Sequence, residues 1–128
     1  MFGLFKKPDS KKTVNQCLEV WDFLTERDRA SSAKNILKIA DYLNQQCNTS
    51  SDALLAIGAL KQDVIRQYGL NDHIHPAFMQ VQILSDYIYS RGQSIVDHTY
   101  ARFALEKITN SLTIDQKREM INKLEKFV

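Results

Sequence analysis

The chain has 128 residues, of which 44% are hydrophobic and 25% charged, with four glycines, two prolines and a net charge of +2. This composition excludes a disordered chain, favours helices over a turn-rich β-sandwich, and lacks the strong positive excess of a dedicated nucleic-acid binder. The sequence has no run of about 18 apolar residues, so no transmembrane segment is expected.

The first ten residues combine an apolar start with lysines and a proline, and residues 1–12 hold four lysines against one aspartate. We expect residues 1–10 to form a basic, apolar N-terminal segment that is loosely docked or mobile, and residues 11–128 to form a single all-helical domain. The apolar start is too short for a secretory signal. Cys17 and Cys47 fall on apolar helical faces, which favours buried reduced thiols and a cytoplasmic location, although a disulfide between two helices stays possible.

A first helix is predicted over about residues 11–27, after a possible cap at Ser10. Its apolar residues repeat at three- and four-residue steps, with Trp21 as the largest. The run Glu26–Arg29 alternates in charge and is interpreted as the solvated end of this helix. Ser31 or Ser32 is then expected to cap a second helix that ends near Gln46.

The densest apolar stretch lies at about residues 50–68. Thr49 and Asp52 resemble a capping box, and Gly69 suits the left-handed residue that ends a helix. Residues 53–60 are apolar on nearly every side of a helical wheel, which is typical of a buried helix. We therefore expect a central buried helix here, with the others packed around it.

Three more helices are predicted beyond Gly69. Pro76 is suited to the first position of a helix that ends near Ser90, and Ser94 can cap a fifth helix that ends near Asn110. Alternatively, these two are one long helix kinked at Gly92. The inward residues of the fifth helix are expected to be Val96, Tyr100, Phe103, Ala104 and Ile108. Thr113 and Gln116 fit a capping box for a last helix, whose expected apolar stripe includes Ile114.

These elements predict an all-α fold, a single-domain bundle or short array of about six helices. The helices share a length but no repeated residue pattern, so a repeat protein is the less favoured interpretation.

The only compact set of chemically versatile side chains contains the three histidines. His73 and His75 can present two imidazoles to one metal, and His98 could add a third ligand suited to zinc. The sequence has none of the usual zinc, calcium, nucleophile or nucleotide-binding motifs, and two histidines in a loop need no special explanation. We therefore expect no catalytic residue and no cofactor, and keep a small metal-dependent enzyme as a third hypothesis.

A second candidate site lies where the fourth and fifth predicted helices meet. Tyrosine and arginine carry much of the binding energy at protein interfaces, because both bury a large area and still form hydrogen bonds. Tyr89, Arg91 and Arg102 are predicted to face outward at this corner. The neighbouring candidates for partner binding are Asp72, His73, Asp97 and His98.

A nucleic-acid surface would need a basic stripe. The last helix carries Lys117, Arg118, Lys123 and Lys126, but acidic residues are interleaved with them, which favours salt bridges within the helix. A nucleic-acid-associated regulatory protein that uses its basic ends is thus the alternative hypothesis. The leading hypothesis is a small cytoplasmic protein-binding domain, most concretely an inhibitor or an immunity- or antitoxin-type protein that occludes a toxin or enzyme. The sequence leaves the oligomeric state open.

Overall fold

The computed structural model describes residues 10–69 and 75–128. These residues form six α-helices and a short 3-10 helix, without any strand: α1 (Ser10–Asp22), α2 (Glu26–Gln46), α3 (Ser50–Tyr68), α4 (Pro76–Arg91), α5 (Ile95–Ile108), α6 (Ile114–Leu124) and η2 (Glu125–Phe127). The predicted all-α fold of about six helices is confirmed. None of the described helices is long and apolar enough to cross a membrane. The predicted N-terminal segment lies, apart from Ser10, outside the described residues.

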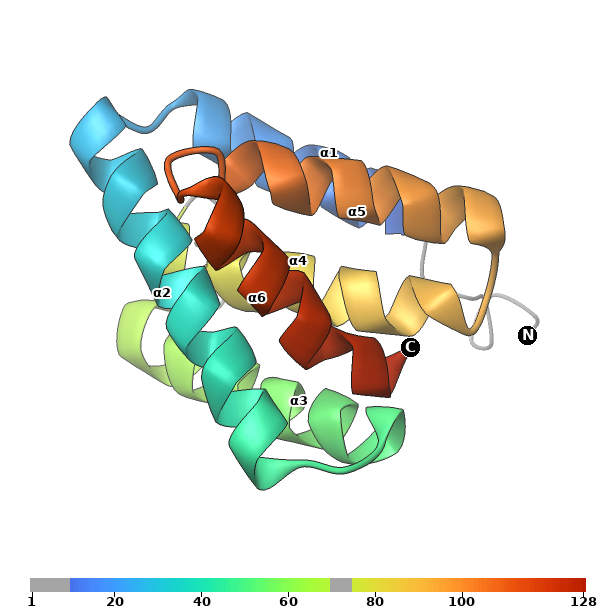
Figure 1. Ribbon diagram of the computed structural model, residues 1–128. Helices are drawn as coiled ribbons and strands as arrows, with labels where there is room; N and C mark the ends of the chain where they lie inside the picture. The colour runs from blue at the N-terminus through green and yellow to red at the C-terminus, as the bar shows by residue number, and fades with distance from the viewer. Residues whose placement is uncertain (1–9, 70–74) are drawn as a thin grey trace.

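Helix α4 is the element around which the others pack. Nine of its 16 residues are buried. It contacts α1, α2, α3 and α5 along its length. Figure 1 shows α1 and α5 above it, α3 below it, and α2 and α6 in front of it. The side chains at the centre of the bundle include Tyr87 and Leu84 of α4, both fully buried.

The predicted helix at residues 50–68 exists with those bounds, but it is not the central helix. Only Ala53 and Ile57 of α3 are buried, and Leu55 is 75% exposed. Leu54, Ala56 and Leu60 are only partly buried against the core, so α3 packs on the outside of the bundle although it is apolar all round. The central position of α4 is not evident from the sequence, because its buried face also carries polar residues: Gln80, Asp86 and Ser90.

The boundary between the first two helices also differs from the prediction. Helix α1 ends at Asp22, and α2 begins at Glu26 because the Thr25 hydroxyl accepts a hydrogen bond from the Asp28 N–H. The alternating run Glu26–Arg29 is therefore the first turn of α2, not the end of α1. Arg29 donates to the Trp21 carbonyl at 3.1 Å and its guanidinium lies 3.8 Å from the Trp21 ring centre, so one side chain stabilises both helix ends. The predicted cap Ser32 is instead buried within α2.

The other predicted helix starts are confirmed. The Thr49 and Ser94 hydroxyls accept from backbone N–H groups three residues on, and Thr113 with Gln116 forms a reciprocal capping box. Gly69 ends α3 with a positive φ of 102°, a conformation that favours glycine. Helices α4 and α5 are separate, with Gly92 between them, so the alternative of one kinked helix is wrong.

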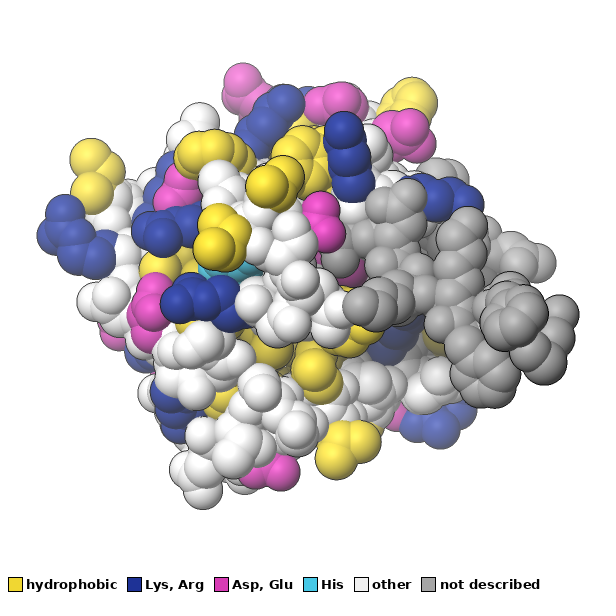
Figure 2. Space-filling view, turned by 90° about the vertical axis from the view of Figure 1, so that its right-hand side faces the viewer, with side chains coloured by type: hydrophobic (Ala, Val, Ile, Leu, Met, Phe, Trp, Pro, Cys, Tyr) yellow, Lys and Arg dark blue, Asp and Glu magenta, His cyan; other side chains and the backbone are white. Residues whose placement is uncertain are grey.

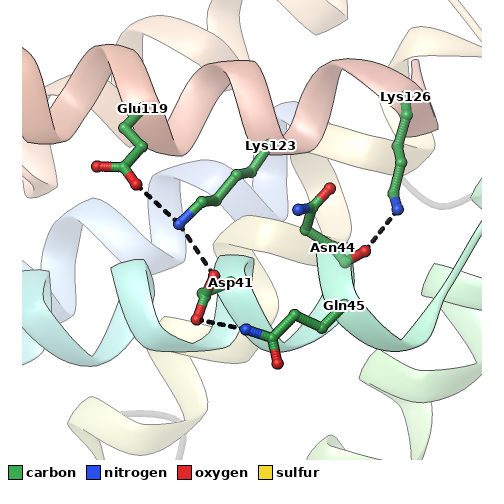
Figure 3. Close-up of polar contacts among 6 residues, drawn as sticks. All are labelled: Asp41, Asn44, Gln45, Glu119, Lys123 and Lys126. Atoms are coloured by element: carbon green, nitrogen blue, oxygen red, sulfur yellow. Dashed lines mark hydrogen bonds and ion pairs between the residues drawn. The ribbon is translucent and has the colours of Figure 1, made fainter.

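A polar clamp holds the C-terminal helix against α2 (Figure 3). The Lys123 ammonium lies 2.9 Å from an Asp41 carboxylate oxygen of α2 and 3.0 Å from Glu119 one turn earlier in α6. Lys126 donates to the backbone carbonyl of Asn44. Beneath these contacts, buried apolar side chains of α6 and η2 face α2 and α3: Met120, Leu124 and Phe127.

Candidate functional site

The predicted corner of Tyr89, Arg91 and Arg102 is brought together only in part. Successive residues of an α-helix are turned by about 100°, so Arg91 lies on the same side as Tyr87, whereas Tyr89 lies on the opposite side. Accordingly, Arg91 and Arg102 act electrostatically on the Tyr87 hydroxyl. Tyr89 lines a cavity with Asp86, and it also lines another cavity with Arg91 at the end of α4. Arg91 therefore lies near both other residues of the predicted corner, whereas Tyr89 and Arg102 line different cavities.

His98 is buried near these arginines, and its contacts are with the core of the bundle. Its ring is 8% exposed, tilts against Tyr87 with centroids 4.7 Å apart, and has Nδ1 3.1 Å from the Tyr87 carbonyl oxygen. Burial lowers the pKa of His98, and nearby Arg91 and Arg102 lower it further, so the neutral imidazole with a proton on Nδ1 fits this site. His98 therefore joins α5 to α4 and offers little surface to a partner.

The three histidines are not brought together as the metal hypothesis requires. His75 caps α4: its Nδ1 accepts from the Ala77 N–H at 3.1 Å, and its ring stacks on Tyr68. His98 packs on Tyr87, which lies about 18 Å beyond His75 along α4 at a rise of about 1.5 Å per residue. His73 and Asp72 lie outside the described residues. Within the described ranges, no group of three or more His, Cys, Asp or Glu side chains converges on a metal position.

Helix α5 turns a different face to the core than predicted. Its buried residues are His98, Ala101, Ala104, Leu105 and Ile108. Val96 and Phe103, predicted to point inward, are 76% and 65% exposed, and the neighbouring Ile95 is 84% exposed. The apolar residues of α5 surround the helix, so periodicity alone could not choose between its two faces.

These exposed residues, Ile95, Val96 and Phe103, lie on the outer side of α5. Ile114, which is 75% exposed and was predicted to lie in the apolar stripe of the last helix, is the first residue of α6 and lines a groove with Arg102 and Glu106 of α5. Figure 2, which looks onto the side of the molecule where α4 turns into α5, shows separate hydrophobic side chains among basic and acidic ones. We call these four apolar residues, together with Arg102 and Arg118, the α5–α6 surface.

The groove in this surface has a volume of about 420 Å³ and charged walls. Its lining residues come from α5, α6 and η2: Arg102, Glu106, Ile114, Lys117, Arg118, Ile121, Asn122 and Glu125. Arg102 pairs with Glu106 at 3.5 Å, and Arg118 pairs with Asp115 at 3.5 Å. Such exposed pairs are weak, so the arginines can exchange them for a partner's acidic groups.

The basic residues of the last helix do not form a free stripe. Each makes a contact with its own chain: Lys117 with Asn110, Arg118 with Asp115, Lys123 with Asp41 and Glu119, and Lys126 with Asn44. Asp115 and Glu119 thus form the predicted salt bridges within the helix, whereas Asp41 pairs with Lys123 from another helix.

Asp97 lies in the first turn of α5, half-buried, with its N–H donating to the Ser94 hydroxyl.

The residue that the sequence interpretation missed is Asp86. It is 6% exposed in the middle of α4, and a single acidic residue on a helix gives no signal that separates it from a solvated one.

Comparison with models of known protein families, with curated proteins and with solved structures found no match.

Proposed function

We propose that this chain is a protein-binding domain that holds its partner through the α5–α6 surface. The observation that carries the proposal is the exposure of Ile95, Val96 and Phe103 on one side of α5, and of Ile114 at the start of α6. Large apolar side chains that gather on one exposed surface, bordered by polar groups, mark sites of protein interaction more often than scattered single ones do. A helix face with such residues can also be laid against an apolar groove of a partner.

The charges at this surface indicate the chemistry of the partner. The basic residues of the groove outnumber its acidic residues three to two: Arg102, Lys117 and Arg118 against Glu106 and Glu125. The partner surface that complements this pattern is apolar at its centre and acidic at its rim. Arginine suits such a rim, because its planar group forms paired hydrogen bonds with a carboxylate.

The specific form of the proposal is an inhibitor or an immunity- or antitoxin-type protein. Such a function needs a rigid scaffold and one complementary surface, and it acts by covering the partner's own functional site. A cytoplasmic location belongs to the same proposal, and the two buried free thiols, Cys17 and Cys47, are consistent with it.

The exposed apolar residues favour a protein over a nucleic acid as the partner, because phosphates are bound by unpaired cations rather than by Ile, Val and Phe. The contacts of Lys123 with Asp41 and Glu119, and of Lys126 with Asn44, point the same way.

The test is affinity capture from the native host with three baits: the parent, a Val96→Ser/Phe103→Ser double variant, and Leu55→Ser. Leu55 of α3 is a matched control, since it is also apolar and 75% exposed but lies away from the α5–α6 surface. The proposal predicts one protein that is captured by the parent and by Leu55→Ser but not by the double variant. The activity of this protein should fall when an equal amount of the parent chain is added. Equal recovery with all three baits would contradict the proposed surface. If every variant still inhibits the captured protein, the inhibitor role is contradicted.

A further inference from the structure

A second cavity lies on the side of α4 that faces away from Tyr87. It has a volume of about 380 Å³ and is bounded by α1, α3 and α4. Pockets of this size hold small organic ligands. The residues that determine its chemistry are Asp86 and Tyr89 of α4, Lys61 of α3, and the ring of Phe78. It is separate from the α5–α6 surface, with which it shares no lining residue.

The burial of the Asp86 carboxylate is energetically unfavourable. Its side chain is held inside the bundle by two hydrogen bonds, from the Thr13 hydroxyl at 2.6 Å and from the Gln82 amide at 3.2 Å. Burial raises the pKa of Asp86 to about 6, against the opposing effects of these two bonds and of Lys61. A buried carboxylate without an ion pair destabilises a fold. No salt bridge to Asp86 is present among the described residues.

Lys61 and Asp86 line the same cavity but do not touch. They influence each other electrostatically, yet no nitrogen–oxygen pair between them comes within the 4.0 Å of an ion pair. The cavity therefore presents one cationic and one anionic group with space between them. The Lys61 ammonium lies 5.2 Å from the centre of the Phe78 ring, which brings an aromatic wall to the same place.

We propose that this cavity binds a small zwitterion of the amino-acid type, with its ammonium group on Asp86, its carboxylate on Lys61 and its apolar part against Phe78 and Tyr89. A ligand with only a positive charge would be repelled by Lys61, and one with only a negative charge by Asp86. An apolar ligand would take water away from both charged groups and offer neither of them an opposite charge. Only a ligand with both charges satisfies the two walls at once.

The test is a titration of the isotopically labelled full chain, followed by its amide NMR spectrum. L-leucine and L-phenylalanine are the probes, and N-acetyl-L-leucine and L-leucinamide are the matched analogues that lack one charge each. The proposal predicts saturable shifts at Lys61 and at residues 82–89 with at least one amino acid, and affinity at least about tenfold weaker for both analogues. The absence of saturable shifts with both amino acids would overturn it. Equal affinity for the analogues would overturn it as well.

Two variants connect this binding to its residues. Asp86→Asn keeps an acceptor for Thr13 and removes the charge, and Lys61→Met keeps most of the stem and removes the ammonium. Each is expected to weaken amino-acid binding at least about tenfold, whereas Asp63→Asn and Lys38→Met, at exposed positions, leave it unchanged. Unchanged binding in folded Asp86→Asn would contradict the assignment. If Asp86→Asn does not fold, Lys61→Met decides the question in the same way.

Discussion

Val96 and Phe103 lie two turns apart on the outer side of α5, and both are exposed while Ala101 and Leu105, on the other side of the same helix, are fully buried. The two faces are similar in apolar character, so the fold leaves one of them without a covering element among the described residues. This relationship underlies the proposed partner-binding surface.

The first prediction concerns the two faces of α5. Phe103→Ser should change the free energy of unfolding by less than about 0.5 kcal/mol, because the side chain is 65% exposed. Leu105→Ala should cost about 2 to 5 kcal/mol, because it opens a cavity in the core. Urea denaturation followed by circular dichroism measures both. A large loss of stability in Phe103→Ser would mean that Phe103 is a core residue.

The second prediction tests the corrected start of α2. Thr25→Ala should reduce the free energy of unfolding by about 1 kcal/mol, because the Asp28 N–H loses its acceptor. Ser31→Ala, at the exposed position where the sequence placed the cap, is the control and should have little effect. If the two variants exchange these outcomes, α2 begins where the sequence analysis placed it.

The third prediction is a pH dependence caused by Asp86. Its pKa is raised from 3.8 to about 6 in the fold, so between these values the folded chain binds more protons than the unfolded chain. This group therefore makes the fold less stable as the pH rises from about 4 to 6, by up to about 3 kcal/mol. Asp86→Asn should remove this loss and be more stable than the parent at pH 8.

The measurement is the difference between parent and variant in denaturant midpoint from pH 4 to 8. The difference is needed because His98, whose pKa is lowered, works in the opposite direction and makes the fold less stable as the pH falls below 6.5. Asp63→Asn, at an exposed carboxylate, should keep the parent's profile. A pH-independent difference between parent and Asp86→Asn would show that Asp86 has no raised pKa.

The sequence predicts helix ends well where a side chain acts locally. Thr49, Ser94 and Thr113 each cap the helix that follows, as expected from hydroxyl residues three positions before a free N–H. Thr25 was missed because the charged run after it resembles the solvated end of a helix, and only the contact of Arg29 with Trp21 reveals the turn between α1 and α2.

Tertiary arrangement could not be predicted in the same way. The exposed face of α5 and the central position of α4 depend on which helices cover which faces, and local periodicity contains no information on that. The candidate site was therefore only partly predicted. Arg91 lies near His98 with Arg102 and lines a cavity with Tyr89, whereas the cavity that Tyr89 shares with Asp86 was indicated by no spacing of residues.

The fourth prediction concerns the rim of the α5–α6 surface. Arg102→Glu reverses a charge that faces the groove beside Glu106. It should therefore weaken binding of the captured partner, mainly by slowing association, and the effect should be larger at low salt. Lys38→Glu, at an exposed position of α2, is the control for net charge. Equal association rates for the two variants at low salt would show that the rim takes no part in recognition.

The most direct test of the central claim is the dissociation constant of the captured partner, measured by calorimetry for the parent, Phe103→Ser and Leu55→Ser. A buried aromatic anchor at the centre of an interface contributes enough that its loss weakens binding by at least about thirtyfold. The account predicts that weakening for Phe103→Ser and parent-like affinity for Leu55→Ser. Parent-like affinity for Phe103→Ser would contradict the claim that this chain binds its partner through α5.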